Sequence, residues 1–153
     1  MTWDDYKKAF EFNGTWRDIY ITETELKDWK TLLEFLAEGS YPVKFLVNGA
    51  EQPLHTNVWQ IFQDQKKDLM PLLSIDISGV AITSHFFDQN EIEFDLDPRE
   101  VTDSSKAEAI LDFMKQIGDE LDKPVHLTEE DAAEDAWFSY DPATGEMAAF
   151  ELY

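Results

Sequence analysis

The chain has 153 residues, of which 33 are acidic and 12 are basic, so its formal net charge is −21. This charge argues against direct binding to nucleic acid or to an anionic membrane surface, because both need a basic footprint. The absence of cysteine excludes disulfides, thiolate zinc sites and cysteine nucleophiles. No apolar run nears the ~18 residues of a membrane span, and the acidic start does not resemble a signal peptide, so we expect one cytoplasmic domain over residues 1–153.

The negative charge is concentrated in the second half of the chain. Residues 1–87 carry 8 basic and 13 acidic side chains, whereas residues 88–153 carry 4 basic and 20 acidic ones. Such a field attracts basic proteins and speeds their association. It also keeps a protein soluble, and that role needs no partner.

The first predicted element is a β-hairpin. Asn13-Gly14 is a strong two-residue turn signal, so residues 9–13 and 15–21 are predicted to be its two strands. The second strand would place Trp16, Asp18 and Tyr20 on one face and Arg17, Ile19 and Ile21 on the other. Neither face is clearly the more apolar, so the pattern leaves open which one is buried.

A helix is predicted over Glu23–Glu38, because leucines and Trp29 recur along one side of it. Thr22 and Glu25 have the spacing of a capping box at its start, and Gly39 suits its C-terminal end. A short strand, residues 43–47, follows.

Residues 50–68 allow two interpretations. Asn57 could cap a short helix with Val58, Ile61 and Phe62 turned inward. The interpretation we favour from sequence is a strand followed by a loop at residues 64–68.

The clearest alternation in the chain lies in residues 72–97, which predict three consecutive strands. Ser78-Gly79 would form the first turn and residues 88–90 the second. This register places Phe86 opposite Ile92 and Ser84 opposite Phe94, so that the apolar residues share one side. The other side of the third strand would carry a row of carboxylates spaced about 6–7 Å apart: Glu91, Glu93, Asp95 and Asp97.

The C-terminal third predicts a second long helix and a final hairpin. The helix runs from about Asp103 to Asp122, and Gly118 within it indicates close packing against a neighbour. Residues 125–127 are predicted to be extended, and residues 128–135 an acidic loop or helical turn. The turn at residues 141–145 would join strands over residues 136–140 and 146–152.

Strands that cluster, instead of alternating with helices, indicate a mainly antiparallel sheet. We therefore predict an α+β fold with about six to eight strands and two main helices packed on one face.

No catalytic or cofactor motif is present, so we predict a protein without a cofactor that is not an enzyme. The residues predicted to contact a partner are the first three members of the carboxylate row, the acidic stretch after residue 128, and the tryptophan that follows it, since tryptophan is a frequent interface anchor. They are Glu91, Glu93, Asp95, Glu129, Glu130, Asp131, Glu134, Asp135 and Trp137.

The alternative site is a metal centre made of His85, Glu93 and Asp95. In the predicted register His85 lies across from Glu93, and imidazole and carboxylates can together hold a divalent metal. The more ordinary interpretation is a cross-strand pair on the surface.

The function predicted is recognition of a basic protein partner. In its concrete form, the chain is a bacterial immunity or inhibitor protein that blocks a nuclease-like toxin, whose substrate cleft must be basic. The alternatives are a metal-dependent hydrolase that uses the His85 site and a structural subunit that assembles with copies of itself.

Overall fold

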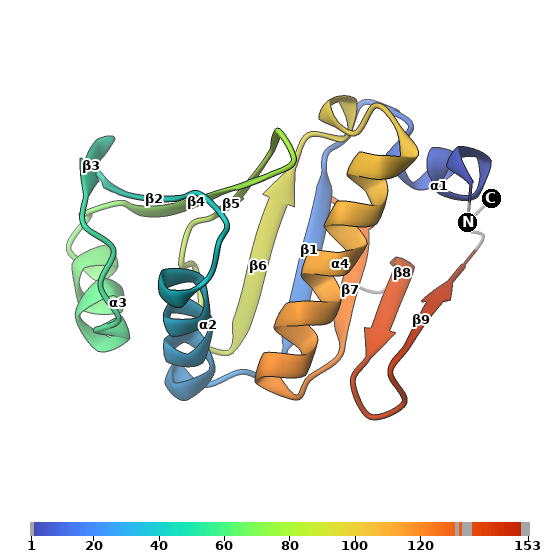
Figure 1. Cartoon of the computed structure of the whole chain (residues 1–153). Coiled ribbons are helices and arrows are strands. Elements are labelled where there is room, and N and C mark those ends of the chain that lie inside the picture. Colours follow the sequence, from blue (N-terminus) through green and yellow to red (C-terminus); the bar gives the residue numbers. More distant parts are fainter. Residues whose placement is uncertain (1, 131, 133–135, 151–153) are drawn as a thin grey trace.

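A computed structural model describes residues 2–130, 132 and 136–150 of the chain (Figure 1). The helices in this part are α1 (Trp3–Phe10), α2 (Leu26–Glu38), α3 (Val58–Lys66) and α4 (Ser104–Leu121), with a single 3-10 turn, η1 (Pro98–Glu100). The strands are β1 (Arg17–Thr22), β2 (Val43–Val47), β3 (Ala50–Gln52), β4 (Pro71–Ile77), β5 (Val80–Ser84), β6 (Glu91–Leu96), β7 (Val125–Glu129), β8 (Ala136–Asp141) and β9 (Glu146–Ala149).

The nine described strands form one sheet in the order β3-β2-β4-β5-β6-β1-β7-β8-β9. Every neighbouring pair is antiparallel, which confirms the predicted α+β class, although the strands are slightly more numerous than predicted. The first strand of the chain, β1, lies inside the sheet between β6 and β7.

One face of the sheet, which we call the helix face, is apolar and carries the helices. Each of the four described helices has an aromatic side chain that contacts an aromatic ring of a strand or of the segment between β5 and β6. These contacts are Tyr6 of α1 with Phe138, Trp29 of α2 with Phe86, Phe62 of α3 with Phe86, and Phe113 of α4 with Phe94. Figure 1 shows α2 and α4, the two longest helices, side by side over the same side of the sheet.

The opposite face, which we call the open face, carries the alternate residues of the same strands. On β6, Ile92, Phe94 and Leu96 are fully buried on the helix face, whereas Glu91, Glu93 and Asp95 are only partly buried. The open face is therefore polar at its centre.

The three strands of the predicted central meander exist, as β4, β5 and β6, but the second turn differs from the prediction. β5 ends at Ser84, so residues 85–90 connect it to β6 in place of the predicted turn at residues 88–90. Phe86, predicted to lie opposite Ile92 in the strand, has a positive φ and stacks its ring on Trp29 of α2. The turn Ser78-Gly79 has a positive φ at both residues, as a tight hairpin turn requires. Thr83 lies opposite Asp95, which is the predicted register of β5 against β6.

The predicted N-terminal hairpin is wrong. Residues 9–13 form the end of α1 and the loop after it, and only the second predicted strand exists, as β1. The cause is the buried side chain of Arg17, which donates hydrogen bonds to the backbone oxygens of Ala9 and Glu11, both at 2.6 Å. These bonds satisfy carbonyls at and just beyond the end of a helix, where helical partners are missing.

Two further predictions need correction. Helix α2 begins three residues later than predicted, because the capping box is formed by Glu25 and Asp28, whose carboxylate accepts from the Glu25 amide at 2.9 Å. Residues 58–66 are a helix, α3, and not the favoured strand, and Asn57 caps it by accepting from the amide of Gln60. Helix α4 agrees with its prediction.

No helix in the described residues is long and apolar enough to cross a membrane.

Candidate functional site

The centre of the open face is formed where β1 meets β6. Their register places Asp18 opposite Asp95, Tyr20 opposite Glu93 and Thr22 opposite Glu91. Directly opposed residues on one face of an antiparallel pair have Cβ atoms about 4.5–5.5 Å apart. These three opposed pairs, at successive positions on the same face, therefore bring four carboxylates close together: Asp18, Glu91, Glu93 and Asp95.

Asp18 is the least accessible of these carboxylates. Its residue is 1% exposed although it lies on the open face, and its neighbours Thr128 and Tyr20 are 0% and 6% exposed. Sequence reasoning missed Asp18, because the faces of residues 15–21 could not be told apart without knowing which strands flank them.

The environment of Tyr20 reflects the same concentration of charge. Burial, followed by the negative charges of Asp18, Glu93 and Glu91 and a hydrogen bond to Asp18, raises the pKa of the Tyr20 hydroxyl well above its usual value. Burial and the charge of Asp88 also raise the pKa of Glu91. The open face is therefore a region where additional positive charge would be favourable.

Asp95 of β6 also contacts residues of and just after β5, the neighbour of β6 on the side away from β1. Its carboxylate accepts a short hydrogen bond from the Thr83 hydroxyl, and one of its oxygens lies 3.7 Å from Nε2 of His85. His85 follows the end of β5, and its ring stacks on the exposed ring of Phe87, with centroids 5.0 Å apart. The His85 ring is therefore placed by Phe87 and Asp95.

A shallow hollow of about 370 Å³ lies beside Asp95 on the open face. It is lined by Trp16, Leu72, Ala81, Thr83, His85, Asp95, Asp97 and Glu100. Trp16 is 40% exposed, so an aromatic surface stands next to the carboxylates. All three of these acids have partners: Asp95 has Thr83 and His85, Asp97 is paired with Arg99, and Glu100 accepts from the Ala81 amide.

Of the acidic stretch after residue 128, the structure describes the contacts of the first two acids, Glu129 and Glu130. The carboxylate of Glu129 accepts from the Asn13 side chain at 3.0 Å, and that of Glu130 accepts from the Trp16 amide at 3.0 Å. Both acids hold the loop between α1 and β1. Asp131, Glu134 and Asp135, the remaining predicted contacts of this stretch, lie outside the described residues.

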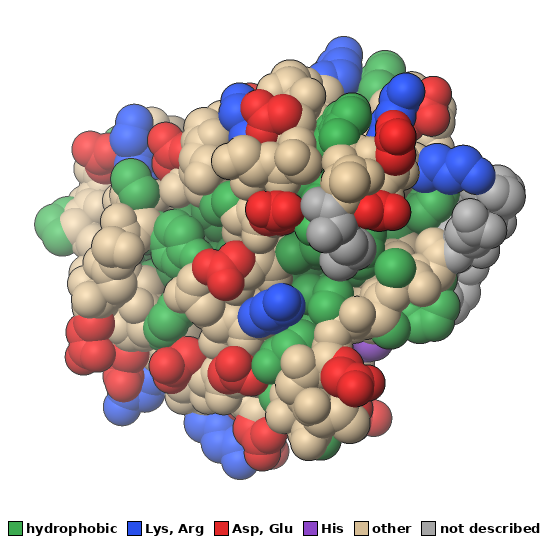
Figure 2. Space-filling view, turned by 45° about the vertical axis from the view of Figure 1, so that its right-hand side comes forward, with side chains coloured by type: hydrophobic (Ala, Val, Ile, Leu, Met, Phe, Trp, Pro, Cys, Tyr) green, Lys and Arg blue, Asp and Glu red, His purple; other side chains and the backbone are tan. Residues whose placement is uncertain are grey.

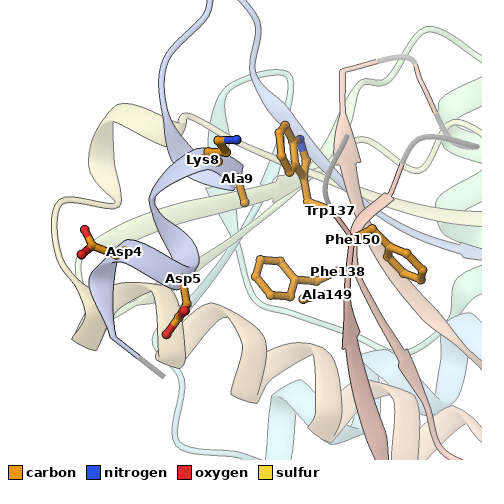
Figure 3. A pocket seen from close by; sticks show the side chains of 8 residues that line it. All are labelled: Asp4, Asp5, Lys8, Ala9, Trp137, Phe138, Ala149 and Phe150. Atoms are coloured by element: carbon orange, nitrogen blue, oxygen red, sulfur yellow. The ribbon is translucent and has the colours of Figure 1, made fainter. Parts of the chain in front are cut away.

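Trp137, the predicted aromatic anchor, is 5% exposed and belongs to the core. In Figure 3 its ring and that of Phe138 both extend from β8 toward α1. The two residues line a hollow of about 280 Å³, whose other lining residues are Asp4, Asp5, Lys8, Ala9, Ala149 and Phe150. Trp137 therefore forms part of a groove and does not project from the surface.

Negative charge is not confined to these places. In Figure 2 acidic side chains are spread across the whole visible side of the molecule, with apolar side chains between them. Net charge alone does not define a site, and the opposed pair Asp18 and Asp95 is what distinguishes the open face.

In the part of the chain that the structure describes, no three His, Asp or Glu side chains are placed to hold a metal ion. His85, Glu93 and Asp95 thus do not form a three-ligand centre.

Comparison with protein-family models, with curated proteins and with solved structures found no match to this chain.

Proposed function

We propose that the protein is a non-enzymatic binding domain for a basic protein, in the manner of a bacterial immunity or inhibitor protein that blocks a nuclease-like toxin. The observation that carries the proposal is the opposed pair Asp18 and Asp95 at the centre of the open face. Glu91 and Glu93 extend this negative area along β6.

An opposed pair of like charges in a sheet is destabilising. The penalty grows where the groups are shielded from water, as Asp18 is, because the effective dielectric constant is lower there. A lysine or arginine from a partner, placed over Asp95, would turn this repulsion into attraction. The repulsion would lower the stability of the isolated domain, and binding of the partner would restore the stability that the repulsion costs.

The type of partner follows from the same chemistry. A nuclease must hold a phosphate backbone, so its cleft carries lysine and arginine. A row of carboxylates about 6–7 Å apart along a strand presents negative charge at several points to such a cleft. Charge complementarity of this kind raises the association rate and selects against acidic partners.

The test is a tagged pull-down from the native cell, eluted by a salt step, with the wild type and the triple variant Glu91→Gln, Glu93→Gln, Asp95→Asn. A basic protein that the wild type captures, that moderate salt releases and that the triple variant fails to capture would support the proposal. The captured protein is then assayed for nuclease activity with and without the domain, and the domain is expected to inhibit it.

A matched control removes the same charge elsewhere. Glu34, Glu38 and Glu120 are exposed residues of α2 and α4, and their replacement by glutamine leaves the open face unchanged. Equal loss of capture in both triple variants would reduce the proposal to a general charge effect. Capture of nothing, or of a partner indifferent to the open-face variant, would contradict it.

A further inference from the structure

A second surface, distinct from the open face, is built where the sheet ends. Within the described residues β9 has only β8 as a neighbour, and Figure 1 shows it at the margin of the sheet, next to α1. An edge strand presents backbone groups that another strand can pair with.

The ladder shows which groups of β9 face outward. The amide of Phe150 donates to the backbone oxygen of Trp137 at 2.9 Å, so the backbone N–H and C=O groups of Phe150 point toward β8. Because backbone groups alternate in direction along a strand, the N–H and C=O groups of Met147 and Ala149 point away from β8. These are the groups that an added strand would bind.

The helix face beside this edge is incompletely filled. Ala149 lies opposite Phe138 in the register and is an exposed residue with a small side chain. The hollow of about 280 Å³ in Figure 3 lies here, between α1 and the aromatic rings of Trp137 and Phe138. A strand added to β9 would turn every second side chain toward this hollow.

The groove continues past Trp137 along α1. A second hollow of about 230 Å³ shares Lys8 and Trp137 with the first and is also lined by Glu11, Phe12, Asn13 and Glu129. Phe12 and Phe150 are 44% and 49% exposed, so apolar surface is accessible along this side.

The charges around the groove select its occupant. The two hollows are lined by four carboxylates, those of Asp4, Asp5, Glu11 and Glu129, and by one ammonium group, that of Lys8. The guanidinium of Arg99 lies over the Phe12 ring, 4.3 Å from its centroid, so acids still outnumber basic groups around the groove by four to two. A second copy of this chain, with a net charge of −21, is electrostatically disfavoured here, whereas a basic segment is favoured.

We propose that β9 and this groove bind an extended segment of a partner protein in which large apolar residues alternate with lysine or arginine. The segment pairs with the outward groups of Met147 and Ala149 as a tenth strand. Its apolar side chains enter the hollows between α1 and β8, and its basic side chains remain at the acidic rim. Affinity comes from main-chain bonds, and specificity comes from the alternation.

The test uses amide hydrogen exchange, followed by NMR on the full chain. The probe is a short peptide that alternates lysine with leucine, and the control peptide alternates glutamate with leucine. The lysine peptide is expected to slow exchange of the Met147 and Ala149 amides by about tenfold or more, because these amides become hydrogen-bonded. The glutamate peptide is expected to have no effect.

Two adjacent residues provide matched variants. Ala149→Tyr places a ring at the hollow and is expected to abolish the protection, whereas Ala148→Tyr, which faces the other side of β9, is expected to retain it. Both positions are exposed, so both variants are expected to fold.

Three results would overturn the inference. The first is unchanged exchange at Met147 and Ala149 with the lysine peptide bound elsewhere, and the second is equal protection in both alanine variants. The third is protection in the free protein that rises with its own concentration, which would assign this edge to a second copy. Because Asp95 is remote from β9 in the strand order, Asp95→Asn is expected to leave peptide binding intact, and this separates the inference from the proposed function.

Discussion

At the scale of single residues, the opposed pair Asp18 and Asp95 is expected to lower the stability of the free domain and to favour binding of a basic partner. Asp95→Asn keeps an oxygen to accept from the Thr83 hydroxyl and removes the repulsion across β1 and β6. It also removes the pairing with His85, 3.7 Å away, but that pair is partly exposed and so contributes little. We expect Asp95→Asn to raise the free energy of unfolding by a few tenths to about 1 kcal/mol. Urea unfolding would measure this, with Asp76→Asn as the control, since Asp76 lies opposite Ala81. Loss of stability in Asp95→Asn relative to this control would contradict the argument.

Tyr20 predicts an alkaline limit to stability. Its pKa is raised in the folded protein, mainly by burial and then by nearby carboxylates, so the folded state keeps a proton that the unfolded chain loses above about pH 10. Stability therefore falls as the pH rises beyond that value. We expect Tyr20→Phe to reduce the slope of unfolding temperature against pH between about pH 9 and 12 more than Tyr41→Phe does. Equal slopes in the two variants would argue against this role.

Arg17 is expected to be the most sensitive polar residue of the fold. It is 0% exposed, and its guanidinium donates to the backbone oxygens of Ala9, Glu11, Thr15 and Trp16. Arg17→Met would leave these oxygens and the carboxylate of Glu129 without their donor or counter-charge, so we expect a loss of about 3–5 kcal/mol in chemical denaturation. Arg99→Met serves as the comparison. Arg99 is exposed, pairs with Asp97 and lies 4.3 Å from the Phe12 ring centroid. Its replacement is expected to lower stability far less than Arg17→Met does, because an exposed ion pair contributes little.

At the scale of elements, the close packing predicted for Gly118 is found where α4 crosses β7 and β8. A Cβ atom at this position would lie 2.7 Å from Cδ2 of Tyr140 and 3.2 Å from Cγ2 of Val125. Gly118→Ala gains up to ~1 kcal/mol of helix propensity, but overpacking costs about 1–3 kcal/mol, so we expect net destabilisation. Adding Tyr140→Leu should relieve the clash, and the double variant should be more stable than the sum of the single changes indicates. Strict additivity would count against the contact.

Elements defined by local signals could be predicted from the sequence. The strands β4, β5 and β6 follow each other with short connections, so alternation and turn residues indicate both their existence and their register. The exact turn between β5 and β6 could not be predicted, because the buried ring of Phe86, which packs on α2, decides the path of residues 85–90. Helix α3 was ambiguous, because Val58, Ile61 and Phe62 in a nine-residue segment match a strand almost as well as a helix. The predicted strand over residues 9–13 failed because a distant interaction, the buried guanidinium of Arg17, decides the local structure there.

The site was predictable in part for the same reason. The row Glu91, Glu93 and Asp95 follows from the alternation of β6 alone. Its partner Asp18 becomes visible only when β1 is paired with a strand more than seventy residues away, and no local pattern reports that pairing. Glu129 and Glu130 were predicted to contact a partner because they lie in an acidic stretch. Their carboxylates instead accept hydrogen bonds from the Asn13 side chain and the Trp16 amide.

At the scale of the whole molecule, the net charge of −21 predicts a stability that increases with salt. Like charges repel more in the compact state than in the unfolded chain. Raising sodium chloride from about 0.01 M to about 1 M shortens the Debye length from about 30 Å to about 3 Å and screens this repulsion. We expect the unfolding temperature to rise over this range. An unchanged or falling temperature would show that attractive ion pairs outweigh the repulsion.

The position of β1 inside the sheet also has a consequence for synthesis on the ribosome. Its neighbours β6 and β7 begin at Glu91 and Val125, so β1 emerges long before either flanking strand exists. Pairings this remote in sequence close large loops and form slowly. The nascent chain must therefore carry Ile19 and Ile21, later fully buried, in an unpaired segment until most of the protein has been translated. We therefore expect the amino-terminal third to be the part that chaperones protect most while the chain is still growing.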